Sequence, residues 1–139
     1  MERTFLVFGA VFGLMGVVFG AFGSHALRSK LTPERLATFE TGVRYQLWHA
    51  LALFAVVFVG SIRFVSRIPT FVDLRELEDS GTWLIWTAGW LFVAGVVLFS
   101  GSLYVLSLTG KRAWGAVTPF GGVCLVLGWA FLLVAILVA

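Results

Sequence analysis

Four apolar stretches, each long enough to cross a bilayer, constrain this chain more than any other feature. They cover residues 5–26, 43–62, 83–108 and 120–138. Crossing about 30 Å of hydrocarbon takes about 20 helical residues, and a backbone in lipid must satisfy its own hydrogen bonds. Only 12% of the residues are charged, against about 25% in a soluble domain. The sequence therefore predicts one all-α integral membrane domain over residues 1–139, a four-transmembrane-helix bundle.

A short amphipathic segment precedes the second apolar stretch. Thr32 is a suitable N-cap, and Pro33 fits the first position of a helix. Apolar residues then recur at helical spacing as far as Gly42. These features predict a short interfacial amphipathic helix at about 33–42. It is either separate from the second span or continuous with it, and Gly42 is the expected bend.

The basic residues lie in or beside the connections between the apolar stretches, which is typical of anchors at lipid headgroups. Six flank the first and third connections: Arg28, Lys30, Arg35, Arg44, Lys111 and Arg112. Four lie on the other side: Arg3, Arg63, Arg67 and Arg75. The positive-inside rule therefore predicts a multi-pass protein of the inner (cytoplasmic) membrane with both termini outside the cytoplasm. The same distribution excludes nucleic acid as a partner, despite a net charge of +3.

Five glycines form a regular stripe along the first apolar stretch. Gly9, Gly13, Gly16, Gly20 and Gly23 are spaced four, three, four and three residues apart. Each glycine costs a soluble helix about 1 kcal/mol relative to alanine, but in lipid small residues let two helices approach closely. A mean period of 3.5 residues keeps the stripe facing a partner. The stripe is predicted to pack on another helix of this chain; the alternative partner is a second copy or another membrane subunit.

Polar side chains gather at the ends of three spans that the topology places in one leaflet. They are His25, Arg44, Tyr45, Gln46, His49, Ser100, Ser102 and Tyr104. The two histidines share a leaflet because the chain does not recross the membrane between them, and Tyr45 lies on the same helix face as His49. We expect one cluster, with a serine or Tyr104 close to a histidine. Three interpretations stay open: hydrogen bonds that fix the helices, a lipid-headgroup or small-ligand pocket that uses Arg44, and bis-histidine haem ligation.

The interiors of the apolar stretches contain no Asp, Glu, Lys or Arg, which argues against a carrier coupled to ions. The sequence shows no nucleophile–base pair, phosphate loop or metal-ligand spacing, so no catalytic residue, metal or cofactor is expected. The leading hypothesis is a non-enzymatic membrane protein that organises lipid or stabilises a membrane assembly. The alternatives are a transporter or channel for a small uncharged or lipid-like solute, with a polar path past Ser100 and Ser102, and a haem-binding subunit.

Four motifs resemble a known family. They are GAFGSHAL at 20–27, TGVRYQLWHALAL at 41–53, LFSGSLYVLSLTG at 98–110 and TPFGG at 118–122. In this order they resemble the small membrane-protein family catalogued as domain of unknown function 423, which includes bacterial inner-membrane proteins and an animal transmembrane relative. The resemblance covers nearly the whole chain and implies four helices, an inner-membrane location and no established activity. It includes the eight polar residues above but not the acidic stretch at 73–79.

Overall fold

The computed structural model describes residues 2–66 and 81–138 and confirms an all-α membrane protein. Within these ranges, four helices are long and apolar enough to cross a membrane. The elements are α1 (Glu2–Phe22), the π-helical turn η1 (Gly23–Leu27), α2 (Pro33–Ser66), α3 (Thr82–Thr109), the 3₁₀ helix η2 (Arg112–Ala116) and α4 (Thr118–Leu137). The acidic stretch at 73–79 and most of the second predicted connection lie outside the described residues.

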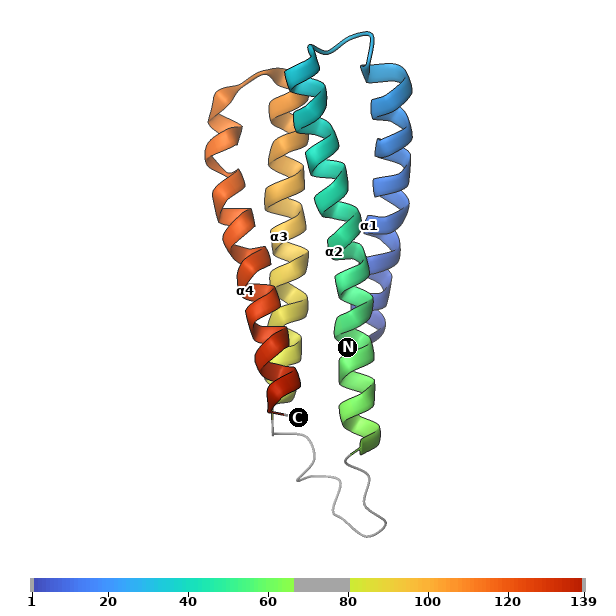
Figure 1. Cartoon of the computed structure of the whole chain (residues 1–139), viewed down its shortest axis with the longest axis vertical. Helices are drawn as coiled ribbons and strands as arrows, with labels where there is room; N and C mark the ends of the chain where they lie inside the picture. The colour runs from blue at the N-terminus through green and yellow to red at the C-terminus, as the bar shows by residue number, and fades with distance from the viewer. Residues whose placement is uncertain (1, 67–80, 139) are drawn as a thin grey trace.

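The four helices lie beside one another in chain order (Figure 1). The extensive contacts are those of α1 with α2, α2 with α3, and α3 with α4. Helices α1 and α4 therefore form the edges of the bundle, and α2 and α3 form its centre. Residues 28–32 and 110–117 connect helices at one end, and both ends of the described chain lie toward the other (Figure 1). We call the end that carries these two connections the connection end.

The amphipathic segment is the beginning of α2 and not a separate helix. Helix α2 runs without interruption through Gly42, which agrees with the expected alternative of a segment continuous with the second span. Gly42 is buried against α3: an added Cβ would lie 2.8 Å from Cε1 of Tyr104 and 3.3 Å from the Ser100 carbonyl oxygen. The helix continues because its first turns pack on α3, where Arg35 Nε donates a 2.6 Å hydrogen bond to the Ser107 carbonyl.

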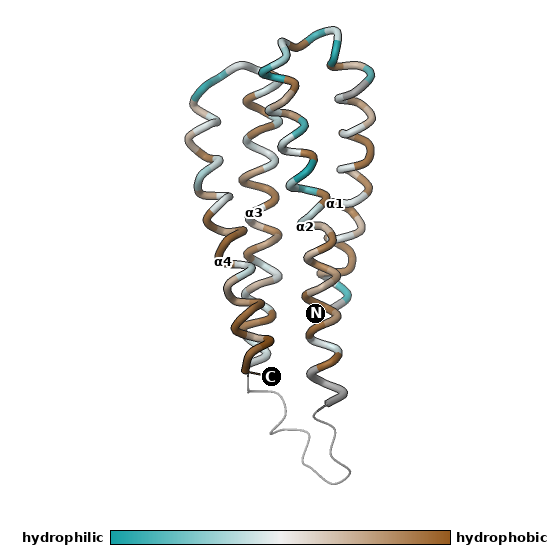
Figure 2. Tube along the Cα trace, viewed as in Figure 1, coloured by the Kyte–Doolittle hydropathy of each residue, from teal (hydrophilic) through white to brown (hydrophobic). Residues whose placement is uncertain are grey.

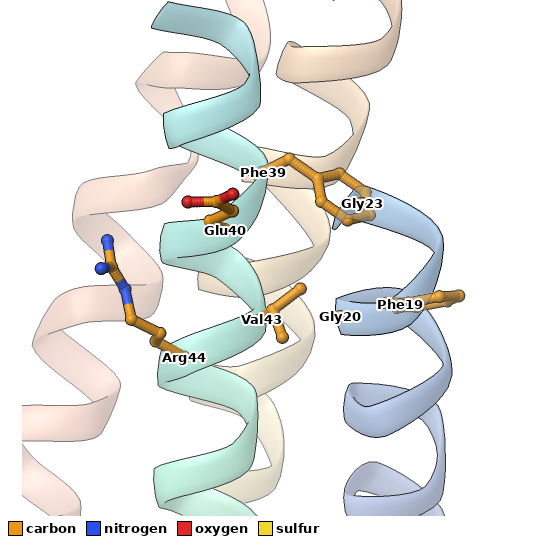
Figure 3. Close-up of a pocket in the computed structure, with 7 residues that line it drawn as sticks. All are labelled: Phe19, Gly20, Gly23, Phe39, Glu40, Val43 and Arg44. Atoms are coloured by element: carbon orange, nitrogen blue, oxygen red, sulfur yellow. The ribbon is translucent and has the colours of Figure 1, made fainter. Parts of the chain in front are cut away.

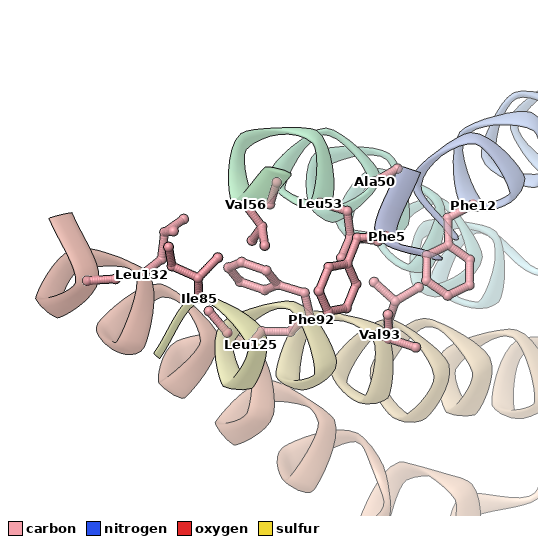
Figure 4. Close-up of a cluster of buried hydrophobic side chains, with 14 of the residues drawn as sticks. Phe5, Phe12, Ala50, Leu53, Val56, Ile85, Phe92, Val93, Leu125 and Leu132 are labelled. Atoms are coloured by element: carbon pink, nitrogen blue, oxygen red, sulfur yellow. The ribbon is translucent and has the colours of Figure 1, made fainter. Parts of the chain in front are cut away.

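The apolar core lies mainly between α2, α3 and α4 (Figure 4). Phe92 of α3 and Leu53 of α2 are fully buried, and Leu125 of α4 is nearly so. Helix α1 reaches the same core through Phe5, whose ring lies 5.6 Å from that of Trp90 in an edge-to-face arrangement. This larger apolar cluster therefore joins all four helices, including the edge helix α1, and a smaller one lies around Leu27, Phe39 and Val43.

The glycine stripe of α1 faces α2. A Cβ added at Gly9 would lie 3.1 Å from the Ala50 carbonyl oxygen, and one at Gly16 would lie 2.6 Å from Leu47 Cδ2. The corresponding distances are 3.5 Å to Val43 Cγ1 for Gly20 and 3.1 Å to Phe39 Cδ1 for Gly23, whereas Gly13 has nothing within 4 Å. Four of the five glycines thus contact α2 of the same chain, because bare backbone there accommodates its bulky side chains.

Candidate functional site

Gln46 connects three helices near the connection end of the bundle. Its Nε2 donates a 2.8 Å hydrogen bond to the Phe12 carbonyl of α1, and its Oε1 accepts a 2.9 Å bond from the Tyr104 hydroxyl of α3. Only 3% of the Gln46 surface is exposed. Gly16 lies beside the amide, and a Cβ there would lie 3.6 Å from Gln46 Nε2, an ordinary contact distance. A buried amide with both ends bonded fixes the mutual positions of these helices.

His49 makes the corresponding connection between α2 and α4. Trp129 Nε1 donates a 3.2 Å hydrogen bond to His49 Nε2, and His49 Nδ1 lies 2.7 Å from the Tyr45 carbonyl oxygen. An indole N–H only donates and a carbonyl only accepts, so Nδ1 must carry the proton. The Tyr45 ring stacks on the imidazole with centroids 6.0 Å apart. Both ring nitrogens are therefore engaged within the protein, which leaves neither free to bind haem iron.

Replacing Trp129 with phenylalanine tests this connection. The variant keeps an aromatic ring against Phe92 and His49 but removes the only donor to His49 Nε2 in the described structure. We expect it to lower the free energy of unfolding by about 1 kcal/mol. Thermal melting in detergent measures this loss. Trp114→Phe is the matched control because Trp114 is exposed like Trp129, but its side chain makes no hydrogen bond among the described residues. Equal melting of the two variants would contradict the assigned bond.

Serine side chains lie at the helix contacts of α3. Ser102 Oγ lies 2.8 Å from Thr118 Oγ1 of α4 and donates to the Phe99 carbonyl of its own helix. Ser100 and Ser102 are only 1% and 2% exposed. Within the described residues, the Ser100 hydroxyl is buried without a hydrogen-bond partner. These serines therefore lie inside the helix packing.

His25 does not join the other polar residues. It is exposed in the π-helical turn, two residues beyond Gly23, which packs on Phe39. Phe39 lies ten residues before His49 along α2, or about 15 Å at 1.5 Å per residue. His49 in turn faces Phe92 and Trp129. The expected histidine cluster is therefore wrong, because helix register separates two residues of the same leaflet.

Among the described residues, neither Ser102 nor Tyr104 has a histidine as a hydrogen-bond partner. Tyr104 bonds to Gln46, and Ser102 bonds to Thr118. Of the eight predicted residues, the structure directly joins Gln46 with Tyr104 and Tyr45 with His49. Bis-histidine haem ligation therefore has no geometric basis.

A groove of about 240 Å³ lies between α1 and α2 near the connection end (Figure 3). Its lining consists of Phe19, Gly20, Gly23, Phe39, Glu40, Val43 and Arg44. The floor is apolar, and the two glycines keep it open because they carry no side chains. Glu40 and Arg44 are exposed, and Figure 3 shows the Arg44 guanidinium extending from the side of α2 that is turned away from α1.

The sequence identified Arg44 and the two glycines of this groove but missed Glu40. The available signal was its spacing, since Glu40 lies one helical turn before Arg44. Arg44 Nη2 donates a 3.1 Å hydrogen bond to Thr41 Oγ1. In the part of the chain that the structure describes, no group of three or more His, Cys, Asp or Glu side chains is arranged to hold a metal ion. The groove combines an apolar floor with one acidic and one basic side chain.

Comparison with known proteins gives consistent matches over the length of the chain. The model of the family described as "Protein of unknown function (DUF423)" matches residues 19–122. The UPF0382 membrane protein YwdK of Bacillus subtilis is 41% identical over 133 residues, which cover 96% of this chain and 95% of that protein. The UPF0382 inner membrane protein YgdD of Escherichia coli is 36% identical over 133 residues, covering 96% and 88%. No solved structure matches the chain.

The region matched by the family model holds every residue that lines the groove and all of the interhelical partners on α2 and α3. The presence of four apolar helices of membrane-spanning length is consistent with the similarity to proteins that are named as membrane proteins. On the strength of these matches and this fold, the chain belongs to the DUF423 family of membrane proteins, whose function is unknown.

Proposed function

We propose that this protein is a non-enzymatic lipid-organising protein of the inner membrane, and that the groove between α1 and α2 holds a phospholipid. The groove itself is the observation that carries the proposal. Its apolar floor suits an acyl chain, and the exposed charges of Glu40 and Arg44 suit a headgroup. Membrane lipids are therefore its proposed partners.

The position of the groove along α2 supports a lipid occupant. Helix α2 has 34 residues, which correspond to about 50 Å and exceed the hydrocarbon thickness. Residues 45–62 carry no charged side chain and span about 27 Å. Glu40 and Arg44 therefore lie where the hydrocarbon gives way to the headgroups. Figure 2 shows the same change, with hydrophilic residues concentrated along the first part of α2.

The rigidity of the groove walls also supports binding. Gln46, which lies two residues after Arg44 on α2, donates a hydrogen bond to the α1 backbone. Gly16 packs against Leu47 beside the groove, and Gly23 packs against Phe39 within its lining. A preformed site loses less conformational entropy when it binds, so a groove of fixed width favours retention of lipid.

The same observations favour this function over a transporter or channel. That alternative depends on a polar path past Ser100 and Ser102, and both side chains are buried at helix contacts. Ser102 is bonded to Thr118, and Gln46 and His49 have partners on other helices. These polar groups support a structural role in holding the helices together.

We further propose that the connection end faces the cytoplasm, so that both termini lie outside it. The exposed residues Arg28, Lys30, Lys111 and Arg112 all lie in or beside the two connections at that end. Positive charge of this kind is favoured on the cytoplasmic side. The groove then opens toward the cytoplasmic leaflet.

Filling the groove tests the proposed function. In Gly20→Leu the new Cβ meets only Val43 Cγ1, at an ordinary contact distance of 3.5 Å, and the side chain extends into the lipid site. We expect wild-type protein extracted in mild detergent to retain phospholipid in native mass spectrometry, and Gly20→Leu to lose most of it.

Gly13→Leu is the matched control, because Gly13 lies on the same helix with nothing within 4 Å of an added Cβ. Gly20→Ala fills less of the groove and should retain an intermediate amount of lipid. Thermal melting of each variant checks that it is folded. Equal lipid retention by folded Gly20→Leu and Gly13→Leu would overturn the proposed function.

A further inference from the structure

Glu40 and Arg44 are an acidic and a basic residue at the membrane boundary whose charges are not paired with each other in the described structure. They lie one turn apart on α2, with the acidic residue first, a spacing that often gives an ion pair on a helix. Here the Arg44 guanidinium bonds to Thr41 Oγ1. Among the described residues, Glu40 and Arg44 make no ion pair with each other or with a neighbour. Both residues are exposed and line the groove, but the Arg44 guanidinium lies on the side of α2 away from α1 (Figure 3), so this side chain must turn toward the groove to meet a ligand there.

The charges of Glu40 and Arg44 determine which chemical groups these two side chains bind. Arginine carries five N–H donors, so one bond to Thr41 leaves several for a phosphate. The Glu40 carboxylate accepts hydrogen bonds and favours a cation. Attraction between charges strengthens where water gives way to hydrocarbon, so both groups gain from partners there. The two side chains begin about 5–6 Å apart, as residues one turn apart on a helix do.

We propose that the groove selects a phospholipid with a phosphoethanolamine headgroup. The phosphate binds Arg44, the primary ammonium binds Glu40, and an acyl chain lies on the apolar floor beside Phe19 and Val43. A two-carbon linker holds the phosphate and the ammonium close together, which matches two opposite charges one helical turn apart. This inference rests on the proposed lipid-binding function and adds the identity of the headgroup.

The other common headgroups fit less well. Phosphocholine has a quaternary nitrogen without N–H donors, so it forms no hydrogen bond with the Glu40 carboxylate. Phosphoglycerol has no cation and leaves Glu40 facing an anionic lipid. Either replacement removes a charge-assisted hydrogen bond, a loss that corresponds to about tenfold in affinity.

A competition experiment measures this selectivity. The full-length protein is placed in nanodiscs with equal amounts of phosphatidylethanolamine, phosphatidylglycerol and phosphatidylcholine of identical acyl chains. Lipids retained after release into detergent are identified by native mass spectrometry. We expect wild-type protein to enrich phosphatidylethanolamine about tenfold over each competitor. Glu40→Gln should shift the preference to phosphatidylglycerol, and Arg44→Gln should reduce retention of all three lipids.

Matched controls separate selectivity from general changes of surface charge. Glu34→Gln and Arg112→Gln remove the same charges from exposed positions that do not line the groove, and should leave the selectivity unchanged. Equal retention of the three lipids by wild-type protein, with Gly20→Leu still losing them, would overturn the headgroup assignment and leave lipid binding intact. Retention that survives Gly20→Leu would instead overturn lipid binding itself.

Discussion

Gly121→Ala is expected to destabilise the protein by about 1–3 kcal/mol, an effect that its neighbour Gly122→Ala should not show. A Cβ at Gly121 would overlap the backbone nitrogen and Cα of Phe99, so the clash cannot be relieved by rotating a side chain. A Cβ at Gly122 would lie 3.7 Å from Phe99 Cδ2, an ordinary contact. Equilibrium unfolding in detergent micelles measures both variants.

The two variants form a close internal control. Both positions lie in the first turns of α4, and both substitutions gain the same helix propensity, about 1 kcal/mol. Their difference in stability therefore reports the approach of α4 to α3. Unfolding free energies within a few tenths of a kcal/mol of each other would show that the two helices are too far apart for Gly121 to contact the Phe99 backbone.

Gln46→Leu should have the second large effect, a loss of about 1–3 kcal/mol in unfolding free energy. The variant removes the acceptor of the Tyr104 hydroxyl, which is partly buried. It also removes the hydrogen bond from Gln46 of α2 to the Phe12 carbonyl of α1. Tyr104→Phe removes the hydroxyl, so the double variant should cost less than the sum of the two single variants. Unfolding of all four proteins completes the cycle.

Strict additivity in this cycle would contradict the bond between Gln46 and Tyr104. Thr87→Val is a useful reference because the Thr87 hydroxyl bonds only to Trp83 of its own helix. Its removal should change stability by less than either single variant of the pair. The comparison separates interhelical bonds from bonds made within one turn.

The helices of this protein were predictable because the physical constraint on them is local. An apolar run of bilayer length must be helical in lipid. Helix α3 covers the predicted stretch 83–108, α1 covers 5–26 only together with the π-helical turn η1, and α4 ends one residue before the predicted end at 138. The beginning of α2 was less predictable. Its amphipathic first turns are compatible with a separate helix, and only the packing of Gly42 and Arg35 on α3 shows why the helix continues.

The glycine stripe was visible in the sequence, but the roles of its members were not. The period indicates which residues share a face and does not indicate what lies opposite each one. Gly16 lies against Leu47, whereas Gly13 lies against open space. The difference arises from the register of bulky side chains on α2, which depends on the tertiary structure.

For the polar residues too, the sequence indicated which residues share a helix face but not which residues on other helices they contact. Tyr45 and His49 were correctly placed on one helix face, because they lie one turn apart. One partner of Gln46 is the Phe12 backbone carbonyl, which no sequence pattern marks. The donor to His49 is Trp129, which the sequence does not distinguish from the other tryptophans of the apolar stretches. His25 and His49 have matching chemistry, but their separation depends on how far α1 slides along α2.

The order of the helices in the bundle has a consequence for biosynthesis. Each helix after the first packs extensively on the one made just before it, so α2 has a binding surface on α1 before α3 is synthesised. Contacts between sequence neighbours close short loops and form quickly. The last helix, α4, then completes the structure by covering α3 and donating from Trp129 to His49. Assembly can therefore follow the direction of translation, one helix at a time, without a search among distant segments.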